Sequence, residues 1–262
     1  MPGRAGRILI VGGHKSEFHQ IQAIFEGALA AGAGEVKAAV PDSLQRLLGP
    51  TFPGIYLPAS QSGSLGKSAL GELLRATEDV DTVVIGANLS NNAETAVLIE
   101  SLIRKIETPV VIASEAIEIL GFHPELITGN PNCLVAGNFA TIFSLAGHHH
   151  LPITIKPGGG VMAKVEVLRQ LSQISRCSYL AFDHEVLVQA GDQVGLTPLE
   201  TDANSVSGQA IGLAATFWTQ NRSKPWEGLM ASSWLLKQAL VKPSDKSIAV
   251  RIRAVLSNFD QH

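Results

Sequence analysis

Short apolar runs alternate along the chain with segments whose apolar residues recur every three or four positions. Residues 7–11 form an apolar run that stops at Gly12 and Gly13. Residues 16–31 follow, and one helical face of this segment carries Phe18, Ile21, Phe25, Ala28 and Leu29. Ser16 is suited to be the N-cap, and a second apolar run, 36–40, is closed by Pro41. This order predicts a βαβ unit with parallel strands and a right-handed crossover.

The same rhythm continues to the end of the chain. Further strands are predicted at 54–57, 82–85, 109–113, 134–135, 179–182 and 185–188, and helices at 43–48, 65–77, 92–106, 139–147, 161–175, 205–221 and 226–240. Residues 121–131 read as loop. From Ser244 onward a helix is favoured, but alternation of apolar and basic residues at 248–253 leaves a strand open. We therefore predict that residues 1–262 form a single α/β domain, a three-layer α/β/α architecture with a mainly parallel central sheet of about eight strands.

Composition narrows the class of protein without indicating its chemistry. The 262 residues are 45% hydrophobic and 16% charged, against roughly 25% charged in an average domain. The net charge of −3 gives no general reason to bind nucleic acid or an anionic membrane. Cys133 and Cys177 form neither a disulfide framework nor a metal-type spacing. We expect a cytoplasmic protein that self-associates, because its apolar fraction is high and its charge low.

A glycine turn lies where the first strand meets the first helix. The sequence Gly12-Gly13-His14 contains neither the dinucleotide pattern nor the P-loop pattern. It is either a ligand-facing loop or only a tight turn. We expect Gly12 and Gly13 at the carboxyl end of their strand, in one crevice with Gly86, because ligands of open α/β sheets collect there.

A second candidate site opens the long helix near residue 205. The stretch 202–209 has small residues and would expose backbone N–H groups, which attract anions. We expect an anion or a phosphate to bind to those free N–H groups. The alternative is ordinary capping by Asn204 or Ser205.

Three further polar segments each have a simpler interpretation. Lys156–Gly160 could cradle a phosphate, but a flexible loop is favoured. His148–His150 could bind a metal, but an exposed turn is favoured, and no metal site is expected. Asp183-His184-Glu185 is interpreted as a hairpin turn rather than an acid/base pair.

The order of these motifs resembles the ribokinase-like superfamily and, within it, the ADP- or ATP-dependent NAD(P)H-hydrate dehydratases, over about residues 7–257. Residues 31–36, followed by Pro41, are similar to the family's A-G-A-G-x-V segment. Residues 82–89 look like its strand ending in V-I-G-P-G-L, and residues 109–113 like the strand that carries D-A-D-A-L. The helix after Gly208 and the turn at 225–227 fall where the family has its last helical pair.

The chain departs from the family at its diagnostic positions. The family motif G-T-G-D, whose aspartate is a general base, is aligned with 205–208, so that Gly208 occupies the acid position. The H-P-G-E-F segment corresponds to 135–139, the lysine of a K-G strand end to Ala181, and the D-A-D-A-L aspartates to 113–115. Because glycine cannot take a proton, Asp202 is the possible substitute, reaching in from the preceding loop.

The resemblance implies a set of site residues and a set of functions. Nucleotide or anion binding would fall to Asn204, Ser205, Val206, Ser207 and Gly208, and the substrate cleft to Gly12, Gly13, His14, Gly86, Asn88 and Asn138. ADP or ATP is the cofactor implied. The leading hypothesis is a divergent relative that binds a nucleotide or small phosphorylated ligand with weak or no catalysis. The alternatives are an active dehydratase with replacement residues, a small-molecule kinase, and a non-catalytic structural oligomer.

Overall fold

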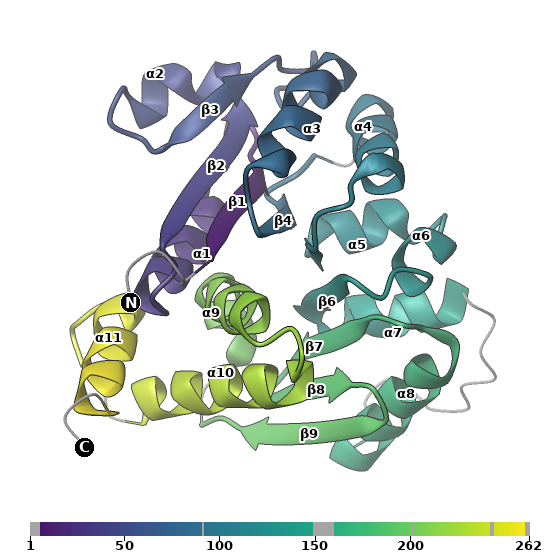
Figure 1. Ribbon diagram of the computed structural model, residues 1–262, viewed down its shortest axis with the longest axis vertical. Coiled ribbons are helices and arrows are strands. Elements are labelled where there is room, and N and C mark those ends of the chain that lie inside the picture. Colours follow the sequence, from purple (N-terminus) through teal and green to yellow (C-terminus); the bar gives the residue numbers. More distant parts are fainter. Residues whose placement is uncertain (1–5, 91, 149–159, 201, 242–243, 260–262) are drawn as a thin grey trace.

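A nine-stranded sheet forms the centre of the computed structural model, which describes residues 6–90, 92–148, 160–200, 202–241 and 244–259 (Figure 1). The strand order is β3-β2-β1-β4-β5-β6-β7-β8-β9. Strands from β3 to β7 along this order pair in parallel, and β8 and β9 are antiparallel additions at one edge. The strands are β1 (Arg7–Gly12), β2 (Glu35–Pro41), β3 (Gly54–Leu57), β4 (Thr82–Ala87), β5 (Val110–Ala113), β6 (Cys133–Asn138), β7 (Ser178–Phe182), β8 (Glu185–Ala190) and β9 (Gln193–Pro198).

Helices cover both faces of the sheet, so the three-layer prediction is confirmed. The helices are α1 (His19–Ala30), α2 (Gln45–Leu48), α3 (Leu70–Glu78), α4 (Ala93–Lys105), α5 (Glu115–Leu120), α6 (Glu125–Thr128), α7 (Phe139–His148), α8 (Val161–Ile174), α9 (Ser207–Gln220), α10 (Pro225–Leu240) and α11 (Ile248–Phe259). Short 3₁₀ turns are η1 (Asp42–Leu44), η2 (Lys67–Ala69) and η3 (Ala203–Val206). Helices α1, α9, α10 and α11 share one core with the sheet, and α3 to α8 share the other.

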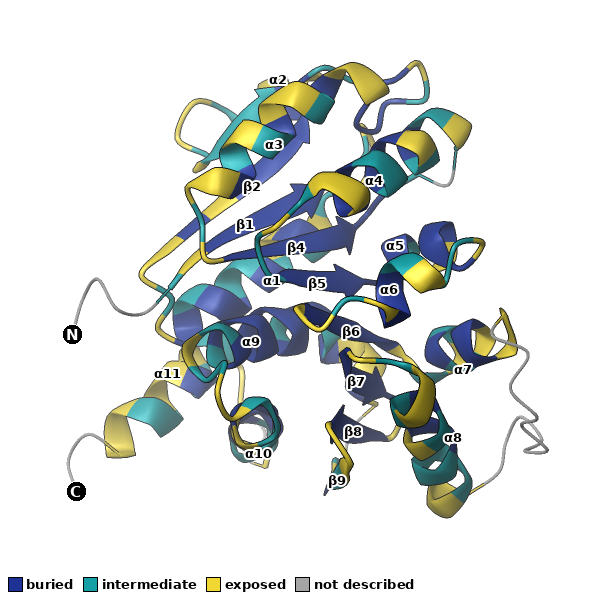
Figure 2. Ribbon diagram, turned by 45° about the vertical axis from the view of Figure 1, so that its right-hand side comes forward, coloured by how far each residue is buried: buried dark blue, intermediate teal, exposed yellow. Residues whose placement is uncertain are grey.

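The two cores follow from the alternation of side chains along each strand. On β1, Ile8 and Ile10 belong to the α1/α9 core, whereas Leu9 and Val11 belong to the opposite core. All four are at most 1% exposed. The central strands β4 and β5 are dark blue from end to end in Figure 2, as expected for a parallel sheet covered on both faces.

Several sequence predictions need correction. The sheet has nine strands rather than about eight, because β9 was not predicted. Helix α6 lies in the segment 121–131 that was expected to be loop, and α5 lies in a segment for which no element was predicted. Helix α1 begins at His19 rather than Ser16, because the N–H groups of His14 and Glu17 bond to each other's carbonyls in a turn, and Ser16 does not cap it. The segment after Ser244, left open above, contains the helix α11.

Glycines set the close approach of α1 and α9. A Cβ on Gly27 would overlap the carbonyl oxygen of Gln209, and one on Gly212 would overlap that of Ile24. The two helices therefore pack backbone to backbone, and the start of α9 lies beside the middle of α1, where Gly208 faces Ala23. None of the described helices is long and apolar enough to cross a membrane.

Candidate functional site

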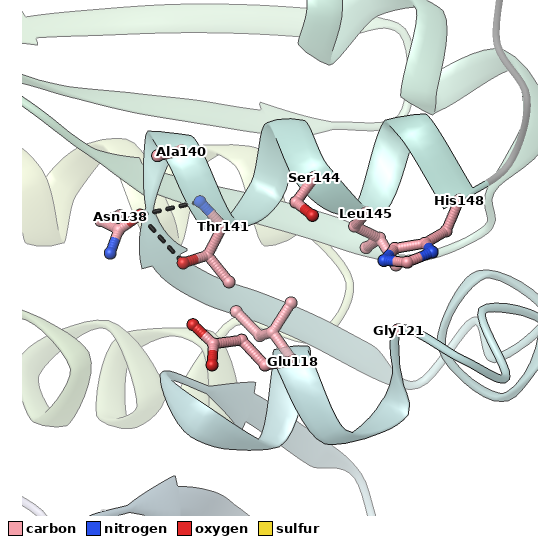
Figure 3. Close-up of a pocket in the computed structure, with 9 residues that line it drawn as sticks. Glu118, Gly121, Asn138, Ala140, Thr141, Ser144, Leu145 and His148 are labelled. Carbon is pink, nitrogen blue, oxygen red and sulfur yellow. Dashed lines mark hydrogen bonds between the residues drawn. The ribbon is translucent and has the colours of Figure 1, made fainter. Parts of the chain in front are cut away.

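Two adjoining cavities of about 310 and 320 Å³ lie at the carboxyl ends of β5 and β6, and together we call them the carboxyl-end cleft. Both are lined by Glu118, Asn138 and Thr141. The first also touches Gln20, Ser114, Glu115, Gly137, Asn204, Ser207 and Ile211. The second extends between α5 and α7 along Ile117, Gly121, Ala140, Ser144, Leu145 and His148 (Figure 3). The position agrees with the rule that ligands of open α/β sheets collect beyond the carboxyl ends of strands.

A strained turn forms one wall of this cleft. Ser114, between β5 and α5, has φ 46° and ψ −120°, a backbone conformation that costs energy for any residue with a side chain. The Gln20 amide donates a hydrogen bond of 2.5 Å to the Ser114 hydroxyl. Gln20 is itself fixed, because its backbone N–H donates to the Asn88 side chain and its side-chain oxygen accepts from the Asn88 N–H. This network ties the ends of β4 and β5 to the start of α1.

Glu115, the first residue of α5, has the most perturbed carboxyl group of the cleft. Burial raises its pKa, and the charges of Glu118 and Glu17 raise it further. Hydrogen bonds from its own N–H and that of Leu89 oppose this shift without cancelling it. Its Oε2 atom is buried and has no hydrogen-bond partner among the described residues. The cleft thus contains a carboxyl group whose pKa is raised and whose second oxygen is buried without a hydrogen-bond partner among the described residues.

Asn138 faces Glu118 across the second cavity and has a structural task there. Its side-chain oxygen accepts hydrogen bonds from the backbone N–H and the hydroxyl of Thr141, at 2.8 and 2.9 Å (Figure 3). Asn138 therefore caps the first turn of α7. His148 lies at the far end of the same cavity, with its ring 5.9 Å from that of Phe122.

The start of α9 is more fully capped than the sequence suggested. The Asp202 carboxylate accepts from the backbone N–H and from the side-chain amide of Asn204, both at 2.9 Å. The N–H of Ser205 donates to the Asp202 carbonyl, and the N–H of Ser207 to the Asn204 carbonyl. Hydrogen bonding by the N–H and amide of Asn204 lowers the pKa of Asp202. An anion at Asn204, Ser205 or Ser207 would have to displace these contacts, so anion binding there stays a prediction that capping opposes.

Gly208 does not face the cleft. A Cβ at this position would lie 2.5 Å from the Cβ of Ala23 on α1, and Val206 is buried in the same core. From this helix start, Asn204 and Ser207 line the cleft. The start of α9 therefore contributes an amide and a hydroxyl to the cleft and no carboxyl group, and the prediction that Gly208 occupies the acid position of the family stays a prediction.

The glycine loops lie together, as expected, but outside the cleft. Gly12 and Gly86 end neighbouring strands, and the N–H of Gly13 bonds to the Ala87 carbonyl at 2.7 Å. A Cβ on Gly12 would overlap the Ala87 oxygen, so close strand packing explains this glycine without a ligand. His14 is held in its turn by Ser16 and by the Ser62 carbonyl. Of the six residues predicted for the substrate cleft, Asn138 lines the two cavities, and Asn88 supports them through Gln20.

The remaining sequence candidates fall away from the cleft or outside the described residues. Val135 and Ala181 are fully buried inside β6 and β7. Asp183 and Glu185 flank the turn between β7 and β8, as predicted, and both pair with Lys164 of α8. Residues 149, 150 and 156–159 lie outside the described part of the chain. Within that part, no group of three His, Cys, Asp or Glu side chains could hold a metal ion.

Sequence reasoning missed Gln20, Glu118 and Thr141 as cleft residues. Ser114 and Glu115 were noted only as replacements for family aspartates. One signal was available, since polar residues directly after a buried strand lie at the carboxyl edge of a parallel sheet. No local signal marks Gln20, which reaches the cleft through the packing of α1.

No family model matches the chain. A bifunctional NAD(P)H-hydrate repair enzyme from Moorella thermoacetica is 35% identical over 136 residues, which is 51% of this chain and 26% of that enzyme. The match thus spans about a quarter of the relative's length.

Solved structures match over nearly the whole chain. A ribokinase-like superfamily protein from Enterococcus faecalis has a TM-score of 0.73 at 13% identity, covering 99% of this chain and 88% of that one. An ADP/ATP-dependent NAD(P)H-hydrate dehydratase from Bacillus subtilis, co-crystallized with ATP/Mg²⁺, has a TM-score of 0.66 at 10% identity, covering 98% and 91%. The fold of this chain is therefore ribokinase-like, and about half of the chain is similar in sequence to an NAD(P)H-hydrate repair enzyme.

Proposed function

We propose that this protein binds ADP, ATP or another small phosphorylated ligand in the carboxyl-end cleft and dehydrates hydrated NAD(P)H weakly or not at all. One observation carries the proposal: the residues that the start of α9 contributes to the cleft, Asn204 and Ser207, include no carboxyl group. An amide cannot accept the proton that a general base must take, which removes on the order of 10²–10⁴ in rate where nothing replaces it. The names of the similar proteins support the ligand class.

The charge of the cleft sets a condition on any phosphorylated ligand. Glu115 and Glu118 line it, and the described lining contains no lysine or arginine. A free triphosphate would be repelled by these carboxylates, whereas a divalent cation would screen them and bridge them to phosphate oxygens. The residues present therefore fit a magnesium nucleotide better than the free nucleotide, and binding should require Mg²⁺.

Binding can be tested by calorimetry and thermal shift with ATP and ADP, each with and without Mg²⁺. Saturating ligand at about 100 times Kd stabilises a protein by about 2.7 kcal/mol. Ser144→Trp should fill the second cavity and abolish the shift, while Ser257→Trp, on the exposed face of α11, should retain it. Absence of a shift with either magnesium nucleotide, or a shift that survives Ser144→Trp, would contradict the proposed site.

A second function is favoured by Glu115. Its raised pKa and partnerless Oε2 are the properties of a group that can exchange a proton with a bound ligand. An active dehydratase would use this carboxyl group in place of the missing acid. In that case wild-type turnover should be readily measured and should fall at least about 100-fold in Glu115→Gln, with nucleotide affinity retained. Equally low turnover rates in the wild-type protein and in Glu115→Gln would instead support the first proposal, a ligand-binding protein with weak or no dehydratase activity.

A further inference from the structure

The two cysteines of the chain lie side by side at the opposite end of the sheet from the cleft. Leu134 of β6 pairs with Ser178 of β7, so one residue earlier on each strand Cys133 lies next to Cys177. Both side chains belong to the same core, beneath α3 to α8, and are 0% and 3% exposed. Neighbouring strands are about 4.8 Å apart, within the Cα separations of about 4.4–6.8 Å that a disulfide spans. Both thiols are free.

The surroundings of the pair make Cys177 the more acidic of the two thiols. Burial would raise its pKa, but hydrogen bonding from Cys133, and the nearby hydroxyls of Tyr179 and Ser175, lower it overall. Burial raises the pKa of Cys133, and so does its interaction with Cys177. The Tyr179 and Ser175 hydroxyls make no hydrogen bond of standard geometry within the described chain. These two buried hydroxyl groups therefore lie near the Cys177 sulfur without another partner.

The positive charge of Arg222, two residues after the end of α9, interacts with the cysteine pair. The charge of Arg222 lowers the pKa of Cys133 against the effect of burial. Its guanidinium is stacked 3.8 Å above the Trp218 ring and donates to the Asn132 side chain at 2.7 Å. Arg222 also lines a cavity of about 640 Å³ at the amino ends of the strands, whereas the two cysteines are buried beneath it and do not line it, so an oxidant would reach them only through local opening. Cationic surroundings are typical of reactive cysteines.

We propose that Cys133 and Cys177 form an oxidation site that reacts with hydrogen peroxide or a related hydroperoxide to give an intramolecular disulfide. The Cys177 thiolate attacks one peroxide oxygen and becomes a sulfenic acid, and the other oxygen leaves as hydroxide and takes up a proton. The Cys133 sulfur then attacks the Cys177 sulfur, and the sulfenic hydroxyl leaves as water with the Cys133 proton. Two thiols and one peroxide thus give one disulfide and two waters.

The experiment follows the thiols of the 262-residue chain, whose two cysteines are Cys133 and Cys177. The reduced protein is treated with hydrogen peroxide, quenched and alkylated under denaturing conditions. The expected results are loss of both thiols, a monomer lighter by two hydrogens, and a proteolytic fragment that joins Cys133 to Cys177. The disulfide closes the segment 133–177, so Tm should rise by roughly 5–10 °C and return on reduction.

Single variants assign the roles of the two sulfurs. Cys133→Ser should leave a Cys177 sulfenic acid that dimedone captures, and Cys177→Ser should react at least about tenfold more slowly. Two thiols that survive while glutathione in the same tube is fully oxidised would overturn the proposal. Oxidation of each thiol separately to a sulfinic or sulfonic acid, or a disulfide between two chains, would also overturn it. The wild-type measurement decides the matter even if a variant does not fold.

Discussion

Replacing Gly208 with aspartate tests whether this position belongs to the site or to the packing of α1 and α9. Aspartate is the residue that the resembled family would supply if 208 were its acid position. In the structure a Cβ here would lie 2.5 Å from the Cβ of Ala23, and Gly208 is buried. The side chain would therefore enter the helix interface, and its carboxylate would leave water without a cationic partner.

The magnitude follows from two costs. Inserting carbon into a packed interface costs about 1–3 kcal/mol, and burying an unpaired carboxylate adds several more after relaxation. Gly208→Asp should thus lower the free energy of unfolding by roughly 3–6 kcal/mol, which corresponds to a Tm lower by on the order of 10–20 °C. Gly208→Ala meets the first cost alone and recovers up to about 1 kcal/mol of helix propensity, so its net loss should be about 1 kcal/mol.

Thermal and urea unfolding of a small variant set would measure these losses. Gly71→Ala on α3 is the control, because no atom lies within 4 Å of its added Cβ, and it should gain up to about 1 kcal/mol. Ala23→Gly combined with Gly208→Ala moves the methyl group from one helix to the other and should recover most of the loss. Wild-type stability in Gly208→Asp, or new turnover in that variant, would show that residue 208 reaches the cleft.

Four further outcomes are expected. The raised pKa of Glu115 means that above pH about 4.5, the ordinary value, the native state still holds a proton that the unfolded chain has lost. The free energy of unfolding therefore falls as pH rises through this range. Glu115→Gln should raise Tm at pH 8, and this gain should vanish near pH 4. Gly86→Ala should cost roughly 3 kcal/mol or more by urea unfolding, because φ is +130° and a Cβ would overlap the Ala113 oxygen. Asn138→Ala should cost about 1 kcal/mol and speed amide exchange in the first turn of α7, whereas Asn138→Asp should preserve the cap. Self-association should give a sedimentation mass that is a multiple of 27.7 kDa.

The layered fold could be predicted because buried parallel strands leave a simple pattern. Runs such as 82–85 and 109–113 are apolar on both faces and stop at short breaks, which distinguishes them from the intervening helices. Strand β9 could not be recognised, because its residues are mostly exposed or half-buried and include Gly195, which lies against Met230 of α10. Helix α5 was missed for another reason: it starts directly after a strained serine, without the usual capping side chain.

The site was harder to predict than the fold. A glycine at the start of a helix looks the same in a sequence whether it admits a phosphate or a neighbouring helix, and Gly208 proved to be the second kind. Asn204 and Asn138 were identified, but their capping contacts, which compete with any ligand, depend on local geometry. The pKa of Glu115 is raised mainly by burial, which depends on how the cleft is packed and leaves no pattern in the local sequence.

A turnover measurement with hydrated NADH tests the central claim most directly. The wild-type protein would be incubated with hydrated NADH and magnesium ATP or ADP, and the recovery of NADH absorbance followed under single-turnover conditions, after nucleotide binding has been confirmed on the same sample. A nucleotide-binding protein whose helix start offers Asn204 in place of an acid should return NADH at less than about 1% of an ordinary enzyme rate. A rate on the order of 1 s⁻¹ or more would contradict this account.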